Sequence, residues 1–493
     1  MKKIIIIGGG IGGLSAGIYA LKAGYEAEIY EKNPVAGGEC MGWNRKGHHI
    51  DNCIHWLTGT DSKTSLWQVW NTMGAIDKNT PYADTEKFYS SRYKGVEATL
   101  WNDLDRTEKE LIAISPEDEA EIKKFIEYTR YAESCVIPAE KPMDMMGVMD
   151  YINMGKSMAN MPKVMKEYGK IDLNGLADRF KSPVLKKLMT DYLPANYTAY
   201  SFLVSYGTMT SGNGNIPLEG SLAMTNRIVK KFKDMGGKLH LKTPVKRIIV
   251  ENGTATGIEL ESGEKVMGDE IISAVDAGFL FNKLLGKEYM TDEWKKAYSD
   301  RNAYPITSGF QAAYSIDADF SGKDTIFFDC DPIKIGDRTF DRIYVKNYGY
   351  DKSFAPDGKA VLQMNIPQTD ADYKFWKSLD KETYKKTKED LVKTVTEAII
   401  SQFPELDGKM EFLDCWTPVT YTRYCNAYHG SYMGFVTTVG AKQMRVKGTL
   451  KNVKNFYIAG QWIMSPGGLP IAAISGKFAV QRILKKEKRS IDI

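Results

Sequence analysis

A run of β-branched residues followed at once by closely spaced glycines opens this 493-residue chain and limits its fold more than any other feature. The run Lys2–Ile7 (KKIIII) is typical of a parallel strand buried on both faces. Gly8, Gly10 and Gly13 follow it with the spacing GxGxxG, and Gly12 lies between the last two. Glycines at this spacing allow a tight turn, a close approach of backbone to a diphosphate and close packing of helix on strand. The pattern therefore predicts a dinucleotide-binding loop.

The residues after the glycines predict the rest of a βαβ unit. Apolar residues recur at helical spacing as far as Gly24, and Glu26–Tyr30 has the composition of a second strand. Glu31 ends that strand, where a carboxylate can accept hydrogen bonds from the adenosine ribose and would repel a ribose phosphate. We therefore predict that Glu31, with the adjacent Lys32, lies at the ribose of an unphosphorylated dinucleotide.

A second glycine pair indicates which dinucleotide binds. Gly37 and Gly38 follow Glu31 closely, and they look like the second glycine motif of FAD enzymes of the glutathione-reductase type. Plain nicotinamide-binding domains are not expected to carry this pair. FAD is therefore the predicted cofactor, with Gly38 and the next residue, Glu39, in contact with it.

Three segments of the chain resemble the family of phytoene desaturases, carotenoid isomerases and retinol saturases. Ile50–Trp56 (IDNCIHW) is similar to the FDTGIHY stretch of that family. Ile216–Asp276 resembles the segment that returns to the flavin domain, and Asn455–Leu484 resembles the segment that closes over the flavin. Beyond the glycine loops, the resemblance implies cofactor contacts at Val245, Gly460, Gln461, Gly468, Leu469 and Pro470.

The resemblance implies an α/β fold with a discontinuous, Rossmann-like FAD-binding domain of the glutathione-reductase type. A second, α+β substrate domain with a helical lid is expected beside it. We expect the flavin domain to comprise residues 1–75, 215–290 and 450–493. The substrate domain then comprises residues 76–214 and 291–449, of which 116–214 has a mainly helical pattern.

Two residues are candidates for a chemical role. His55 lies in the family-like stretch, close to where the chain re-enters the flavin domain; a packed structural histidine is the alternative. Tyr424 belongs to the aromatic-rich segment Thr417–Gly430 (TPVTYTRYCNAYHG), which we read as the last strand before the closing segment. Tyr421 and Tyr428 accompany it, either shaping a pocket or buried with backbone partners.

The closing segment predicts a second helix start beside the cofactor. Phe456–Ala459 reads as a short strand, Ser465–Gly468 as a turn and Ile471–Ile483 as an amphipathic helix. The helix dipole and the N–H groups near Gly468 and Leu469 would stabilise negative charge on a reduced flavin.

Two departures from the family pattern accompany these motifs. Arginine often follows the glycine pair in such enzymes, whereas this chain has Glu39, so that Arg45 or the helix dipole would have to supply positive charge. A carboxylate often follows the strand-ending glycine, whereas Gln461 follows Gly460 here. An amide still accepts and donates hydrogen bonds.

A methionine-rich stretch lies in the helical part of the substrate domain. Lys141–Lys166 holds eight methionines, and methionine packs adaptably on irregular apolar surfaces. The stretch is open to three interpretations: a channel for a long apolar substrate, an interfacial helix that takes substrate from a membrane, or a Met-rich core or lid. Lys156, Lys163 and Lys166 suit each of them.

Composition excludes several classes of function. The net charge of +4 is the difference between 66 basic and 62 acidic residues, so nucleic acid is not an expected partner. Six cysteines without a CxxC, and five histidines without a metal-binding spacing, predict neither disulfides nor a metal site. No GxSxG elbow supports hydrolase chemistry. No apolar run reaches the roughly 18 residues of a spanning helix, so we expect a cytoplasmic protein, free or peripherally attached to a membrane.

The resemblance implies an oxidoreductase that makes, removes or isomerises a carbon–carbon double bond in an apolar, unsaturated molecule such as a polyene or retinoid-like lipid. Because only one GxGxxG is present, the electron donor or acceptor is expected to reach the flavin at the open site or through another protein. Two rivals share the architecture: a flavin amine oxidase, and a non-catalytic lipid-binding protein. Intact glycines and Glu31 argue against the second.

Overall fold

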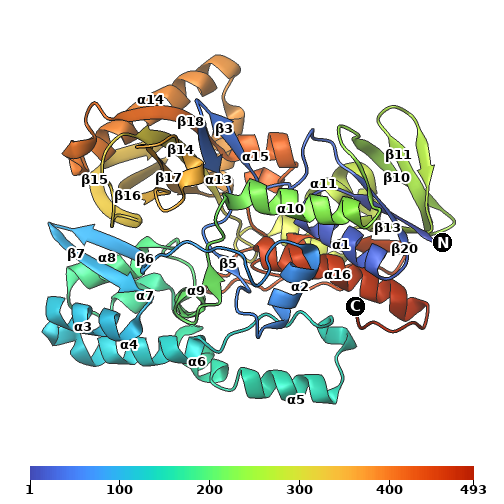
Figure 1. The fold of residues 1–493 in the computed structure, drawn as a ribbon, viewed down its shortest axis with the longest axis horizontal. Helices are drawn as coiled ribbons and strands as arrows, with labels where there is room; N and C mark the ends of the chain where they lie inside the picture. Colours follow the sequence, from blue (N-terminus) through green and yellow to red (C-terminus); the bar gives the residue numbers. More distant parts are fainter.

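The computed structural model describes residues 1–493 and contains two sheets, with a block of helices beside the second (Figure 1). The first sheet has nine strands in the order β10-β11-β20-β13-β1-β2-β9, with β12 paired to β11 and β19 paired to β20. Its strands are β1 (Lys3–Ile7), β2 (Glu26–Tyr30), β9 (Lys238–His240), β10 (Val245–Glu251), β11 (Thr254–Leu260), β12 (Lys265–Met267), β13 (Glu270–Ser273), β19 (Thr449–Leu450) and β20 (Val453–Ile458).

The predicted βαβ unit forms the centre of the first sheet. β1 is parallel to β13 on one side and to β2 on the other, so that Ile6 pairs with Ile272 and with Ile29. The apolar run of β1 is buried because both faces of the sheet are covered. The predicted strands and the helix between them are confirmed, and β9 and β13 bring two distant segments alongside them.

Helices cover this sheet and share one hydrophobic core of 62 residues with it. α1 and α16 approach so closely that a Cβ on Gly476 would lie 2.4 Å from the carbonyl oxygen of Gly12. Because these glycines have no side chains, α1 and α16 pack closely, and both helices begin at the same edge of the sheet. The helices are α1 (Ile11–Lys22), α2 (Ser65–Met73), α10 (Gly220–Asp234), α11 (Ala277–Phe279), α12 (Asp292–Ser299) and α16 (Gly468–Lys486).

The second sheet has seven strands in the order β18-β14-β17-β16-β15-β6-β7. All neighbours are antiparallel except β15 and β6, and α13 and α14 pack on the sheet. Strands β14, β15, β16 and β17 follow one another along the chain between residues 308 and 368. The elements are β6 (Lys87–Tyr93), β7 (Val96–Trp101), β14 (Ser308–Ile316), β15 (Thr325–Ile335), β16 (Arg338–Asn347), β17 (Ala360–Gln368), β18 (Met410–Trp416), α13 (Asp370–Ser378) and α14 (Lys381–Gln402).

The stretch from residue 116 to 214 is mainly helical, as predicted, and it packs on the β6–β7 hairpin around a core of 26 residues. Figure 1 shows α5 at the edge of this block, away from both sheets. The helices are α3 (Leu104–Ile114), α4 (Glu119–Ala132), α5 (Val148–Ser157), α6 (Met161–Tyr168), α7 (Leu173–Ala177), α8 (Pro183–Asp191) and α9 (Ala199–Thr210). Two short ribbons pair β3 (Gly42–Arg45) with β4 (His48–Asp51) and β5 (Leu57–Thr58) with β8 (Gly214–Asn215).

Two local predictions were wrong. The segment Thr417–Gly430 is not a strand: β18 ends at Trp416, and α15 (Pro418–Cys425) follows. Thr417 is the N-cap and Pro418 occupies the first helical position, where its missing N–H costs nothing. The closing helix, α16, is also not amphipathic, because it is buried on nearly all sides between α1 and the rest of the core.

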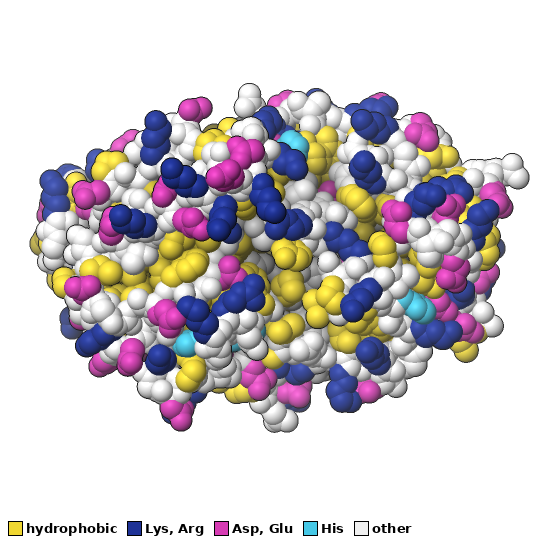
Figure 2. Space-filling model, turned by 90° about the horizontal axis from the view of Figure 1, so that it is seen from above, with side chains coloured by type: hydrophobic (Ala, Val, Ile, Leu, Met, Phe, Trp, Pro, Cys, Tyr) yellow, Lys and Arg dark blue, Asp and Glu magenta, His cyan; other side chains and the backbone are white.

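None of the helices combines the length and the apolar character that crossing a bilayer requires. On the face shown in Figure 2, Lys and Arg side chains alternate with Asp and Glu side chains, as the nearly balanced charge predicts.

Candidate active site

The glycine loop between β1 and α1 has the shape of a phosphate cradle. Gly8 has a φ of +98°, which L side chains rarely adopt, and a Cβ on Gly13 would lie 1.9 Å from the Gly8 carbonyl oxygen. At Gly10, by contrast, the atom nearest a Cβ would be the Gly38 Cα at 3.9 Å. Gly8 and Gly13 are therefore required by the turn, whereas Gly10 and Gly38 lie next to each other at distances that leave room for a Cβ on Gly10.

The start of α1 leaves its N–H groups free for a ligand. The N-cap is Gly10, no side chain caps the helix, and the first turn holds no acidic residue. Uncapped N–H groups and the positive end of the helix dipole form a site for an anion such as a diphosphate. The Gly37 N–H donates to the Gly9 carbonyl oxygen at 2.8 Å, which holds the second glycine pair against the first loop.

Glu31 lies at the end of β2 with its carboxylate against this loop. The N–H groups of Gly9 and Asn33 each donate to one carboxylate oxygen at 2.8 Å, and the residue is only 7% exposed. Each oxygen retains a lone pair for a further donor such as a ribose hydroxyl. The Thr243 N–H donates to the Glu31 carbonyl oxygen, which places the start of β10, and with it Val245, near the same end of the loop.

Lys32 points elsewhere. Its ammonium group donates to the Asn426 side-chain oxygen at 2.8 Å and to the Arg423 carbonyl oxygen at 3.2 Å, at the end of α15. Burial lowers the pKa of Lys32. The structure therefore uses this lysine to hold α15 against the flavin domain rather than to reach a ribose. Arg45, the possible substitute for a basic residue at position 39, pairs with Asp414 on β18 at 2.9 Å.

The predicted contacts of the closing segment meet at the start of α16. Gly460 follows β20 with a φ of +107°, and its N–H donates to the Ser475 hydroxyl at 2.7 Å. Gln461 accepts a hydrogen bond from the Gly468 N–H at 3.1 Å. The N-cap of α16, Gly467, has no side chain of its own, so Gln461 satisfies the Gly468 N–H, and no acidic residue lies in the first turn. Leu469, together with the adjacent Pro470, then forms part of the wall of a cavity.

Glu39 lies in the same wall, where its side chain accepts a hydrogen bond from the Gln461 amide at 3.3 Å. Burial raises the pKa of this carboxyl group to about 8, and the nearby Asp276 carboxylate adds to the rise. Glu39 is therefore protonated at neutral pH. The missing basic residue is replaced by a neutral acid, not by a negative charge.

Asp276 is a buried acid near Glu39 that the sequence did not assign to the site. It caps α11, and its carboxylate accepts hydrogen bonds from the N–H groups of Phe279 and Tyr428, both at 2.9 Å. Burial raises its pKa to about 6 despite these donors. The one feature of the sequence that could have indicated its place near the site is that it follows the returning strand, β13, which ends at Ser273.

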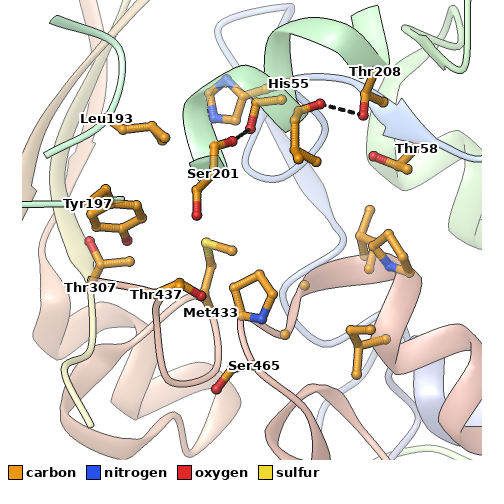
Figure 3. A pocket seen from close by; sticks show the side chains of 18 of the residues that line it. His55, Thr58, Leu193, Tyr197, Ser201, Thr208, Thr307, Met433, Thr437 and Ser465 are labelled. Atoms are coloured by element: carbon orange, nitrogen blue, oxygen red, sulfur yellow. Dashed lines mark hydrogen bonds between the residues drawn. The ribbon is translucent and has the colours of Figure 1, made fainter. Parts of the chain in front are cut away.

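A cavity of about 1710 Å³ runs from the start of α16 to the inner face of the second sheet and to the helical block. Nearly half of its lining residues are hydrophobic. Figure 3 shows side chains reaching it from α9, from the loop before β5 and from the C-terminal segment. Residues that represent these walls are His55, Leu193, Tyr197, Ser201, Met433, Ile463, Ser465 and Leu469.

His55 is an exposed residue that lines this cavity (Figure 3). Although the ring is exposed to the cavity, the surrounding protein desolvates it, and this desolvation, followed by the charge of Lys346, lowers the pKa of His55 to about 3. The ring is therefore neutral at physiological pH. It can accept or donate one hydrogen bond but does not serve as an imidazolium acid.

Tyr424 does not reach the cavity. Its side chain is 54% exposed. Its backbone carbonyl oxygen accepts a hydrogen bond from the Asn33 side chain, which is distant in the sequence. The reason is the wrong strand assignment, since α15 turns the residue outward. Tyr421, one helical turn earlier, is buried and hydrogen-bonded to Gln311 at 2.6 Å and to Trp416 at 3.0 Å. We therefore leave Tyr424 out of the site.

Comparison with known proteins agrees with this geometry. A family model described as flavin containing amine oxidoreductase matches residues 11–484, nearly the whole chain. The chain belongs to this family. As a member it is an FAD-dependent oxidoreductase, in agreement with the predicted cofactor and with the resemblance to desaturases and isomerases.

Three similar proteins illustrate the relationship. A 4,4'-diapophytoene desaturase (4,4'-diapolycopene-forming) of Methylomonas sp. is 22% identical over 515 residues, which cover 99% of this chain and 96% of that protein. The chloroplastic prolycopene isomerase of Daucus carota is 24% identical over 97% of this chain and 79% of that protein. An oxidoreductase of Methanosarcina mazei has a similar fold, with a TM-score of 0.60 and 17% identity over 96% of this chain and 98% of that one.

The residues fit FAD. The cradle of glycines, the uncapped start of α1 and the buried Glu31 match a dinucleotide of which the ribose is unphosphorylated. The start of α16 opens into a cavity large enough for the remaining ring system and a substrate.

Proposed function

We propose that this FAD-dependent oxidoreductase acts on a carbon–carbon double bond of an apolar, unsaturated molecule, by desaturation, saturation or isomerisation. The observation that carries the proposal is the cavity, because it joins the start of α16 to a large space of which nearly half of the lining residues are hydrophobic. The relatives named as a diapophytoene desaturase and a prolycopene isomerase support a polyene as the substrate.

Each part of the protein has a role in this proposal. The loop at Gly10 and Gly38 and the start of α1 would hold the diphosphate, Glu31 would hold the ribose, and the start of α16 would lie against the flavin ring. Bound FAD supplies the capacity to accept or to give a hydride. The chain supplies position, a dry environment and electrostatic stabilisation.

The polar groups at the start of α16 suit a flavin ring that becomes negatively charged on reduction. The N–H groups and dipole at the start of α16 stabilise negative charge there, and no acidic side chain of the first turn opposes them. Because Glu39 keeps its proton up to about pH 8, it adds no charge beside the cofactor. His55 is neutral and borders the space where the substrate would lie.

An amine is a less suitable substrate, although the family includes amine oxidoreductases. The ammonium group of Lys346 lies buried in the cavity wall, where it would repel a protonated amine. A buried cation is compatible with a neutral or an anionic substrate.

We also propose that α5 contacts a membrane surface peripherally. It contributes no buried residue to the core, and Val148, Met149, Tyr151 and Ile152 are all at least 42% exposed. Lys156 follows on the same helix, and Lys163 and Lys166 are exposed on α6. Apolar side chains with lysines beside them suit the interface of an anionic bilayer. Met143, Met154, Met158 and Met165 of this region also line the cavity, which offers an apolar substrate a path.

The test of the main proposal is anaerobic photoreduction of the bound flavin, followed by addition of polyenes, enones and amines in separate experiments. Recovery of oxidised flavin with a polyene or enone, or bleaching of oxidised flavin by a polyene, supports the proposal. Turnover of amines alone, with release of peroxide, would replace it by an amine oxidase.

A further inference from the structure

Lys346 is a buried cation in the wall of the cavity. It lies on β16 and is 5% exposed. Its ammonium group donates to the His55 carbonyl oxygen at 3.4 Å and lies 4.8 Å from the centre of the Tyr348 ring. These contacts are weak for a group that water would otherwise solvate fully.

No acidic side chain forms an ion pair with Lys346 within 4.0 Å. Burial lowers the pKa of Lys346, and the charges of Asp51 and Asp324 act in the opposite direction. Asp51 is already occupied, since it accepts hydrogen bonds from the N–H groups of Cys53 and Ile54 and from the Ser221 hydroxyl. Buried charges in proteins are usually paired, because desolvation of a lone charge is costly. Lys346 is therefore a cation without its own counter-ion.

The sheet face around Lys346 is polar, in contrast to the methionine-rich end of the cavity. Lys346 pairs with Gln363 in the β16–β17 register, so the same face carries Asn365 on the neighbouring strand. The Asn365 side chain lines the cavity, and its buried oxygen has no hydrogen-bond partner. The cavity thus has an apolar end at α5 and α6 and a polar end on the second sheet.

We propose that Lys346 binds the carboxylate of the substrate, and that the substrate is consequently a long-chain unsaturated acid rather than a neutral hydrocarbon. The inference rests on the proposed function and narrows it. A carboxylate supplies the missing counter-ion, while the unsaturated chain fills the apolar part of the cavity. The relatives act, by their names, on carotenes or their derivatives, so this residue would mark a change of substrate class.

The competing explanation is structural: Asp324 would balance Lys346 across a water molecule, and the ammonium group would take no part in binding. Asp324 also lines the cavity, and burial raises its pKa. The two explanations differ in what removal of the charge changes. If Lys346 binds a carboxylate, its removal weakens the binding of acids selectively; if Asp324 is its partner, acids and esters are affected equally.

The experiment uses cis-parinaric acid, a fluorescent conjugated tetraene acid, and its methyl ester. Each is titrated into the flavin-loaded protein at pH 7, and binding is followed by ligand fluorescence and by the perturbation of the flavin spectrum. The wild type should bind the acid about 10- to 100-fold more tightly than the ester, the range expected for hydrogen bonds to a charged group. Lys346→Met should abolish this preference and leave the affinity for the ester within about twofold.

Lys187→Met is the matched control, because Lys187 also lines the cavity but is only half-buried; it should keep the preference for the acid. Equal affinity of the wild type for acid and ester, or a preference that survives Lys346→Met, would overturn the inference. The comparison of acid with ester in the wild type needs no variant, so misfolding of a variant cannot decide the result.

Failure of this inference is distinguishable from failure of the proposed function. If a neutral polyene changes the redox state of the flavin in the wild type and in Lys346→Met alike, the inference that the substrate is an acid is wrong. The proposed function then still stands. If no polyene, acid or neutral, affects the flavin, both fail.

Discussion

The side-chain amide of Gln461 lies 3.3 Å from the carboxyl group of Glu39 and accepts a hydrogen bond from the first N–H of α16. One amide therefore connects the segment after the second glycine pair to the helix start that faces the flavin site. Because burial raises the pKa of Glu39 to about 8, this connection is electrically neutral at pH 7.

Glu39→Gln tests that neutrality. The pKa of Glu39 is higher in the folded protein than in the unfolded chain, so wild-type stability falls as pH rises from about 4.5 to about 8. Glutamine cannot ionise. The free energy of unfolding of Glu39→Gln, relative to the wild type, should therefore increase between pH 5 and pH 9, by about 4 kcal/mol. Thermal or urea unfolding across this range measures it. A difference that does not change with pH would show that Glu39 is ionised throughout.

Gly10→Val tests the position of the diphosphate. No atom lies within 3.8 Å of the place where a Cβ would stand, so the fold tolerates the side chain, while a branched group there would occupy the cradle. We expect a folded protein that retains less than about one tenth of the wild-type flavin, since a steric clash with the diphosphate costs more than 1.4 kcal/mol. Flavin content per chain by absorbance is the measurement. Gly155→Val, on exposed α5, should keep normal flavin content. Normal content in Gly10→Val would show that the site is misplaced.

His55 should stay neutral from pH 5 to pH 8. Its pKa is lowered to about 3, and the charge of Lys346 contributes to this. In NMR spectra of the labelled protein, with His55→Gln used for assignment, the His55 ring signals should not titrate near pH 6.5. In Lys346→Met the pKa of His55 should move upward, because one cause of its depression has been removed. Titration of His55 near 6.5 in the wild type would contradict the described environment.

Met149→Asp combined with Ile152→Asp tests the membrane contact of α5. Both side chains are exposed, at 64% and 42%, so the change should leave stability nearly unaffected. Each apolar group that enters a bilayer is worth roughly 1.5 kcal/mol or more, so sedimentation with anionic vesicles should weaken at least tenfold. Val96→Asp, at a similarly exposed site on the β6–β7 hairpin, is the control and should bind like the wild type. Equal loss in both variants would assign the effect to charge alone.

Much of the flavin side of the fold follows from local sequence signals. The apolar run before Gly8, the helix that ends before Gly24 and the acid at Glu31 predict consecutive elements, and their geometry depends mainly on near neighbours in the sequence. Gly460 and Gly468 are indicated by the family resemblance, and both have a positive φ, a conformation that glycine adopts without strain.

The other side of the site depends on contacts between distant segments. Lys346 is one of many lysines in the sequence, and only the register of β16 and β17 turns it into the cavity. Lys32 is equally ordinary, and the end of α15, nearly 400 residues away, determines its partner. The strand predicted over Thr417–Gly430 failed because the cap at Thr417 and Pro418 outweighed the β-propensity of its tyrosines.

The most direct test of the whole account is mass spectrometry of the molecule that the purified protein releases on denaturation, together with its visible spectrum before release. The account predicts FAD, at about one molecule per chain, with flavin absorbance that disappears in Gly10→Val. A nicotinamide nucleotide, or a colourless protein that FAD cannot reconstitute, would contradict it.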